Sequence, residues 1–195
     1  GMLYRARGHR VRFVSMTNGD AGHHEQGGVA LARRRFAEAQ AAGAIADVEY
    51  QMLDIHDGEL EPTLEVRHTV IRIMREFQAD LVICHRPNDY HPDHRAVGIT
   101  VQDAAYTVTV PNVQPLTPEL RRAPVVGYMY DDFTIPTAYK ATIAVSTDEV
   151  WDRKVDMVHC HASQWYEWLA YNGDYMDEVP EGDAERRAWI EQGMK

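Results

Sequence analysis

Two hydrophobic periodicities alternate along this chain and divide it into candidate strands and helices. Short runs that are apolar, or that alternate apolar and polar residues, predict strands over 11–16, 47–53, 81–84, 125–130 and 141–145. Helical spacing and capping residues predict helices over 3–7, 29–42, 147–161 and 184–192, and from Pro62 and Pro92 onward. In the helix from Pro62, one buried face is predicted from the spacing of Val66, Val70, Ile73 and Phe77.

The order of these elements predicts an α/β fold. Strands that alternate with helices favour a doubly wound, mostly parallel sheet with helices on both faces. The chain opens at the end of a helix, so the first strand expected of such a sheet would lie upstream of Leu3.

The tetrapeptide His91-Pro92-Asp93-His94 follows the apolar run 81–84 closely. Pro92 fits the first position of a helix, where a missing N–H costs nothing. Asp93 then falls in the first turn, where the helix dipole favours negative charge. Open α/β sheets bind ligands where a strand ends and a helix begins, so we predict a site here.

Composition narrows the class of protein. A chain of 195 residues with 45% hydrophobic content suits one globular domain. The formal charge of −10 argues against nucleic-acid or anionic-membrane partners. No apolar run approaches the roughly 20 residues that span a bilayer, and the start lacks a signal-peptide core, so we expect a cytoplasmic protein.

Histidine is frequent, with ten residues in 195. Seven of the ten gather in three groups, namely His23 with His24, His85 with His91 and His94, and His159 with His161. Such enrichment suggests metal or proton chemistry, although solvated loop histidines would give the same count.

Five sequence elements then occur in an order typical of one family. They are Thr17–Gly22 (TNGDAG), Arg35-x-x-Glu38, Leu53–Leu60 (LDIHDGEL), Asn88–His94 (NDYHPDH), and Lys154 with His161–Gln164 (HASQ). Over most of its length the chain resembles the LmbE/PIG-L-type zinc N-deacetylases.

The resemblance implies a Rossmann-like fold that hydrolyses acetamido groups, commonly on amino sugars, with one bound zinc. It implies that His94 is a zinc ligand and that His91 donates a hydrogen bond to the oxyanion of the tetrahedral intermediate. It also implies that Asp93 orients His91 and favours its charged form. His161 and Gln164 are expected to pack behind the site. The chemistry agrees, because catalytic zinc keeps three protein ligands and an open position, and amide hydrolysis needs a donor for developing negative charge.

The chain departs from the family pattern in one respect. The resemblance implies two further zinc ligands and a general base from a His-Pro-Asp-Asp-type motif, and no such motif precedes His91. We therefore expect a single deacetylase domain over 1–195 that is cut short at its N-terminus, and we leave open whether it is also cut at its C-terminus. We expect its zinc site to be weakly occupied or empty, and its activity to be impaired.

Substrate contacts are implied for four further residues, Asp20, His23, Arg35 and Asp57. Each has an alternative. The loop Asp20–Glu25, with its adjacent His23 and His24, could form a substitute metal cluster, Arg35 could pair with Glu38 three residues on, and Asp57 could be a turn former.

The leading hypothesis is a zinc-dependent hydrolase that removes an N-acyl group from a small amino sugar or glycoconjugate. Two alternatives remain open. One is a non-catalytic ligand-binding module that has lost the metal site, and the other is a metal-dependent esterase or phosphoesterase. The sequence also leaves open whether the chain forms a homo-oligomer.

Overall fold

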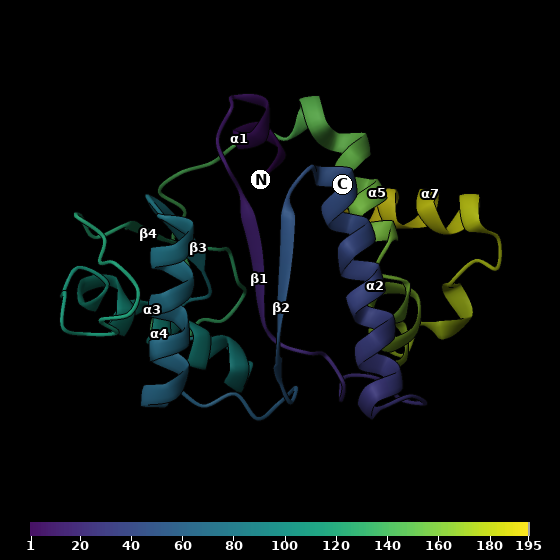
Figure 1. The fold of residues 1–195 in the computed structure, drawn as a ribbon. Coiled ribbons are helices and arrows are strands. Elements are labelled where there is room, and N and C mark those ends of the chain that lie inside the picture. The colour runs from purple at the N-terminus through teal and green to yellow at the C-terminus, as the bar shows by residue number, and fades with distance from the viewer. Residues whose placement is uncertain (195) are drawn as a thin grey trace. The chain divides into compact units, whose positions relative to one another are not determined.

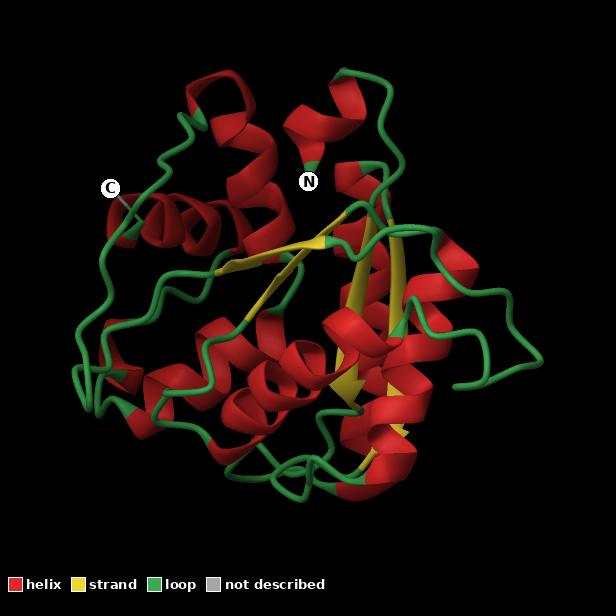
Figure 2. Cartoon of the chain, turned by 90° about the vertical axis from the view of Figure 1, so that its left-hand side faces the viewer, coloured by secondary structure: helices red, strands yellow, loops and turns green. Residues whose placement is uncertain are grey.

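A computed structural model describes residues 1–194 as helices that alternate with parallel strands (Figures 1 and 2). The strands are β1 (Arg12–Thr17), β2 (Glu49–Ile55), β3 (Leu81–Cys84) and β4 (Val125–Tyr128). The helices are α1 (Met2–Ala6), α2 (Gly28–Ala46), α3 (Leu64–Phe77), α4 (Pro92–Thr107), α5 (Trp151–His159), α6 (Leu169–Asn172) and α7 (Asp183–Gly193), with short 3-10 or π turns η1 (Asp148–Val150), η2 (Ser163–Trp168) and η3 (Met176–Glu178). The predicted α/β class with parallel strands is confirmed.

Tertiary contacts divide the chain into two compact units. The first unit holds residues 1–57 and the segment from Val145 onward, and the second holds Gly58–Ala144. In each unit two strands pair in parallel, β1 with β2 and β3 with β4. The sequence predicted one continuous sheet, whereas each strand has a single strand partner within the described residues 1–194.

In the first unit, α2 packs on β2 and on α5, and α5 packs on α7 (Figure 1). A core forms around Val155, Tyr166 and Ile190. We predicted that the helix before β2 ends at Ala42, with Gly43 closing it, but α2 continues to Ala46. A Cβ at Gly43 would lie 3.1 Å from the Val48 carbonyl oxygen, so the glycine allows the returning chain to approach the helix closely.

In the second unit, α3 packs against α4, and α4 contacts β3 (Figure 1). The predicted apolar face of α3 is only partly correct. Its buried residues are Val70, Ile71, Met74 and Arg75. The buried face is therefore rotated from the one predicted, because it includes the arginine.

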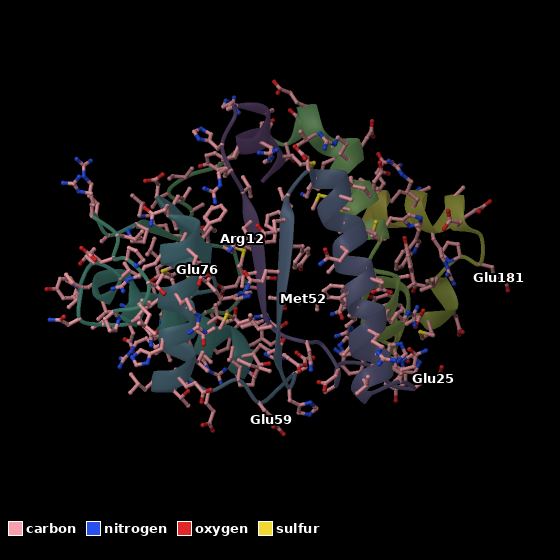
Figure 3. All side chains as sticks on the ribbon, viewed as in Figure 1. Arg12, Glu25, Met52, Glu59, Glu76 and Glu181 are labelled. Carbon is pink, nitrogen blue, oxygen red and sulfur yellow. The ribbon has the colours of Figure 1, made fainter. Side chains whose placement is uncertain are left out.

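The Arg75 side chain explains this rotation. It is 1% exposed and donates hydrogen bonds to six backbone carbonyl oxygens, those of Thr107, Val108, Val110, Val113, Gln114 and Thr117. The next residue, Glu76, is exposed on α3 (Figure 3). Four of these oxygens, those of Thr107, Val108, Val110 and Gln114, also accept from backbone amides, so the guanidinium adds a second set of donors that ties the irregular segment 107–117 to α3.

Two other predictions in the C-terminal half differ from the structure. Residues 141–145 were predicted as a strand and have no regular structure, with Ile143 81% and Val145 66% exposed. Their β-branched side chains favour a strand, but a strand forms only beside a partner that accepts its backbone hydrogen bonds. The long helix predicted over 147–161 is shorter, since α5 covers 151–159 and a separate π turn, η2, follows.

No helix among the described residues is both long enough and apolar enough to cross a bilayer.

Candidate active site

Residues 85–94, which comprise the loop that joins β3 to α4 and the first residues of α4, are named here the histidine loop (Figure 1). It carries the predicted tetrapeptide, and the strand, loop and helix occur as the sequence indicated. His91 is the N-cap residue of α4 and Pro92 is at its start. The chemistry-bearing side chains therefore lie at the carboxyl end of a parallel strand and the N-terminus of a helix.

Two contacts hold the histidine loop against α4. Arg95 donates to the carbonyl oxygens of Asp89 (2.8 Å) and Tyr90 (2.9 Å). A Cβ at Gly98 would lie 2.7 Å from backbone atoms of Arg86 and Pro87, so only glycine allows this approach. The loop is thus positioned by backbone contacts as well as by its own sequence.

A cluster of metal-type donors surrounds Asp89, which is 2% exposed. Its Oδ1 accepts from the His91 amide (3.0 Å) and lies 3.1 Å from His94 Nδ1. The imidazole of His85 stacks on that of His94, with ring centroids 3.9 Å apart and 3° between the planes. One ligand atom from each of His85, Asp89 and His94 lies within 4.8 Å of the others. Sequence reasoning gave His85 no role, although its spacing from Asp89 and His94 was visible.

This cluster fits zinc in donor type and only partly in geometry. Two imidazoles and a carboxylate are common ligands of catalytic zinc. Ligand atoms held tetrahedrally about 2.0–2.2 Å from zinc lie roughly 3.3–3.6 Å from one another. The three donor atoms of this cluster lie within 4.8 Å of one another, which is a looser limit. Ring nitrogen lone pairs also lie in the ring plane, so parallel rings of His85 and His94 cannot both direct a nitrogen at one ion. One ring must turn before both bind.

Burial, and next to it the nearby His94, lowers the pKa of His85. The unprotonated form is the one that binds metals, because the ligating nitrogen must carry a lone pair.

The hydrogen bonds of His91 define which of its nitrogens carries the proton. Its Nδ1 accepts from the Asp93 amide at 3.2 Å. We therefore assign the neutral ring with its proton on Nε2. Nε2–H is then available as a hydrogen-bond donor, the kind of group that the implied oxyanion role requires.

The Asp93 carboxylate has different partners from those implied for it. It is 5% exposed and accepts from the amides of Gly58 (2.7 Å) and Leu60 (3.2 Å). It thereby anchors the start of the second unit to α4. Its contact with His91 runs through the Asp93 amide. The roles implied for the carboxylate, to orient and to charge His91, stay predictions, and a charged ring would lose the hydrogen bond that Nδ1 accepts here.

Three other predicted residues meet in the first unit. Arg35 lies on α2, and its Nη2 donates to Gln164 Oε1 (2.6 Å) and to the Gly22 carbonyl oxygen. Arg35 Nη1 lies 3.8 Å from Asp57 Oδ2. Asp20 accepts from the Asp57 amide (3.0 Å) and pairs with His56 (2.7 Å).

Protein atoms enclose the Arg35 guanidinium on several sides, and this burial lowers its pKa. A Cβ at Gly19 would lie 2.7 Å from Arg35 Cδ, which explains a glycine in the TNGDAG element. Glu38, the alternative partner that the sequence offered, pairs with Arg34 (3.3 Å) and accepts from Ser163.

His23 has contacts that do not favour a substrate role. Its side chain is 1% exposed, its Nδ1 accepts from the amides of Glu25 and Gln26, and its Nε2 lies 2.8 Å from Glu167. Both ring nitrogens therefore have protein partners, and we assign His23 to support of its loop. The rings of His23 and His24 stack with 12° between their planes, which also does not suit a shared ion.

His161 is half-buried beside Tyr50, with ring centroids 6.4 Å apart. Burial lowers its pKa. Gln164 supports Arg35, as described above, while the expectation that these two residues pack behind the histidine loop stays a prediction.

Comparison with known proteins identifies the family. The model of the PIG-L family, described as GlcNAc-PI de-N-acetylase, matches residues 2–105, more than half of the chain and the whole histidine loop. This chain belongs to the PIG-L family. The family that the sequence elements predicted is confirmed.

Among relatives of this PIG-L protein is the diacetylchitobiose deacetylase of Thermococcus kodakarensis, 29% identical over 173 residues. The match covers 81% of this chain and 60% of that relative, so the chain spans less than two thirds of its length.

Two solved structures share the fold. The N,N′-diacetylchitobiose deacetylase of Pyrococcus horikoshii has a TM-score of 0.76 and 22% identity, over 91% of this chain and 69% of its own. The 4-carboxy-2-hydroxymuconate hydratase of Pseudomonas putida also has a TM-score of 0.76, with 21% identity over 97% and 81% of the two chains. A PIG-L fold thus accompanies two kinds of reaction, and the fold alone does not decide the activity.

Proposed function

We propose that this chain hydrolyses the N-acetyl group of a small amino sugar or glycoconjugate at the histidine loop, with zinc as cofactor. The observation that carries the proposal is the Nε2–H donor of His91, fixed by the hydrogen bond from the Asp93 amide to Nδ1. It lies beside His94, with ring centroids 4.7 Å apart. The family match and the deacetylase among the relatives support the choice of reaction.

In this proposal His94 is the principal metal ligand, and Asp89 and His85 supply the other donors that this chain offers. Bound zinc would lower the pKa of a water molecule to about 7 and polarise the acetamido carbonyl. The stacked rings of His85 and His94 oppose shared coordination until one turns. We therefore propose weak zinc affinity and correspondingly low activity for the 195-residue chain.

His91 acts on the oxygen of the acetamido group. As water adds to the carbonyl carbon, negative charge develops on that oxygen, and His91 Nε2–H donates a hydrogen bond to it. Cleavage of the C–N bond then gives acetate and a free amine. The neutral tautomer needs no proton transfer to begin this role, because its donor is already in place.

Substrate recognition is proposed for the cluster of Asp20, Arg35 and Asp57 in the first unit. Their carboxylates and guanidinium match the donors and acceptors of sugar hydroxyl groups.

The test is a panel of substrates with the zinc-supplemented chain. N,N′-diacetylchitobiose should release acetate and a free amine in equal amounts, while p-nitrophenyl acetate and p-nitrophenyl phosphate should be hydrolysed more slowly. Preferential ester or phosphoester hydrolysis would replace the proposed reaction with an esterase or phosphoesterase. Saccharide binding without release of acetate would indicate a binding module.

A further inference from the structure

The loop that follows β4, residues 129–139, begins beside the histidine loop, and it is named here the β4 loop. β3 and β4 are parallel and pair in register from Leu81 with Val125 to Cys84 with Tyr128. The Met129 amide continues this ladder by donating to the Cys84 carbonyl oxygen at 2.9 Å. Carboxyl ends of adjacent parallel strands meet at one edge of a sheet, so the two loops leave that edge together.

Arg86, the residue after His85, fastens the β4 loop by its guanidinium. Nε and Nη2 donate to the two carboxylate oxygens of Asp131, at 2.6 and 2.7 Å. The two side chains are only 12% and 9% exposed. A bidentate pair of this kind fixes both distance and orientation.

The same guanidinium reaches further along the loop. Nη2 donates to the Phe133 carbonyl oxygen (2.8 Å) and Nη1 to that of Thr137 (2.9 Å). Its carbon atom lies 5.6 Å from the centre of the Tyr139 ring. Arg86 therefore holds the beginning and the end of the β4 loop next to the histidine loop.

The exposed part of the β4 loop presents an aromatic ring beside a carboxylate. Tyr130 is 71% exposed, and its ring meets that of Tyr139 edge-on with centroids 5.5 Å apart. The Tyr130 hydroxyl donates to the exposed carboxylate of Asp132. An aromatic face accepts the apolar side of a sugar ring, and a carboxylate accepts hydrogen bonds from its hydroxyl groups.

We propose that the β4 loop is a saccharide-recognition element, in which Tyr130 and Asp132 contact the sugar that carries the reacting acetamido group. Arg86 is a positioning residue that acts through the loop. This inference rests on the proposed function, because it takes the substrate to be a sugar. The histidine loop and the β4 loop both belong to the second unit.

Saccharide binding tests the two contact residues directly. Isothermal titration calorimetry with N,N′-diacetylchitobiose, on zinc-supplemented protein, should show about a tenfold loss of affinity for Tyr130→Ala and at least as large a loss for Asp132→Asn. The control is Tyr106→Ala, which removes an equally exposed tyrosine (74%) from α4 and should leave affinity unchanged. Affinities of the Tyr130 and Asp132 variants equal to that of the control would overturn the proposal.

Arg86→Lys tests the positioning role. Lysine keeps the charge but cannot form the bidentate pair, so amide hydrogen exchange should accelerate over 129–139 and KM should rise with little change in kcat. A loosened loop with unchanged KM and affinity would mean that Arg86 is merely structural and that the loop does not recognise the sugar.

These outcomes separate the inference from the proposed function. Acetate release that is insensitive to Tyr130→Ala and Asp132→Asn would sink the inference and keep the deacetylase. Binding that these variants weaken, in a protein that releases no acetate, would keep the inference and remove the deacetylase. A wild-type chain that does not bind the disaccharide overturns the inference outright.

Discussion

The imidazole ring of His85 lies almost parallel to that of His94, with 3° between the planes and 3.9 Å between the centroids. Two stacked rings contact each other through their faces, whereas two ligands of one ion must both point a ring nitrogen at the ion. The relationship therefore places two donors of the right type side by side in an arrangement that metal binding has to change.

We predict that zinc binds the chain weakly and that both histidines contribute. Competition with a chromophoric chelator should show a loss of more than about 100-fold in affinity for His94→Ala, since even outer-shell partners of metal ligands are worth 10–100-fold. His85→Ala should also weaken binding, while His68→Ala, a half-buried histidine of α3, should not. Undiminished affinity in the His94 variant would remove the metal site from the histidine loop.

Replacing His91 should distinguish its role as the N-cap of α4 from its proposed role as the oxyanion donor. His91→Asn keeps a residue type that caps helices well but removes the Nε2–H donor. Its urea midpoint should stay near that of the wild type while kcat falls roughly 10²–10³-fold, the scale for loss of an oxyanion donor. Full activity in this variant would exclude His91 as the donor.

Arg75 should govern the stability of the second unit. Arg75→Lys replaces the buried guanidinium, which donates to six carbonyl oxygens, by an ammonium group that cannot reach them all, so the free energy of unfolding should fall by about 3 kcal/mol. The control is Arg72→Lys, an exposed change on the same helix, which should shift it by less than about 0.5 kcal/mol. Equal urea midpoints for the two variants would contradict the role given to Arg75.

The ion pair of Glu167 should make stability depend on acid pH. Arg34, followed by His23, holds the pKa of Glu167 below its ordinary value. A lowered carboxyl pKa adds stability that is complete above the unfolded pKa of about 4.3 and is lost as pH falls through the folded value.

The comparison of Glu167→Gln with the wild type checks this sign. Glu167→Gln should be less stable than the wild type near pH 6, and the gap in urea midpoint should narrow below about pH 4.3. Glu181→Gln, in the exposed loop before α7, should show no gap at either pH (Figure 3). A difference in urea midpoint between the wild type and Glu167→Gln that widens in acid would contradict a lowered pKa for Glu167.

The histidine loop was predictable because its signals are local. An apolar run, a polar stretch and Pro92 at the first turn of a helix specify strand, loop and helix without reference to distant residues. The family elements added the candidate roles of His91 and His94.

Features that depend on distant partners were missed. Arg75 reads as a surface residue until the carbonyl groups of 107–117 surround it. Residues 141–145 have strand propensity but no strand partner, and Gly43 looks like a helix end until β2 packs against it. The Arg86–Asp131 pair joins residues 45 positions apart, and no local pattern indicates it.

Release of acetate from N,N′-diacetylchitobiose at saturating zinc tests the central claim most directly. The assay compares the wild-type chain with His94→Ala and with the control His68→Ala. We predict slow, zinc-dependent release by the wild type, equal release by the His68 variant, and none by the His94 variant. Equal rates for the wild type and the His94 variant, or no release by the wild type at any zinc concentration, would contradict a deacetylase centred on the histidine loop.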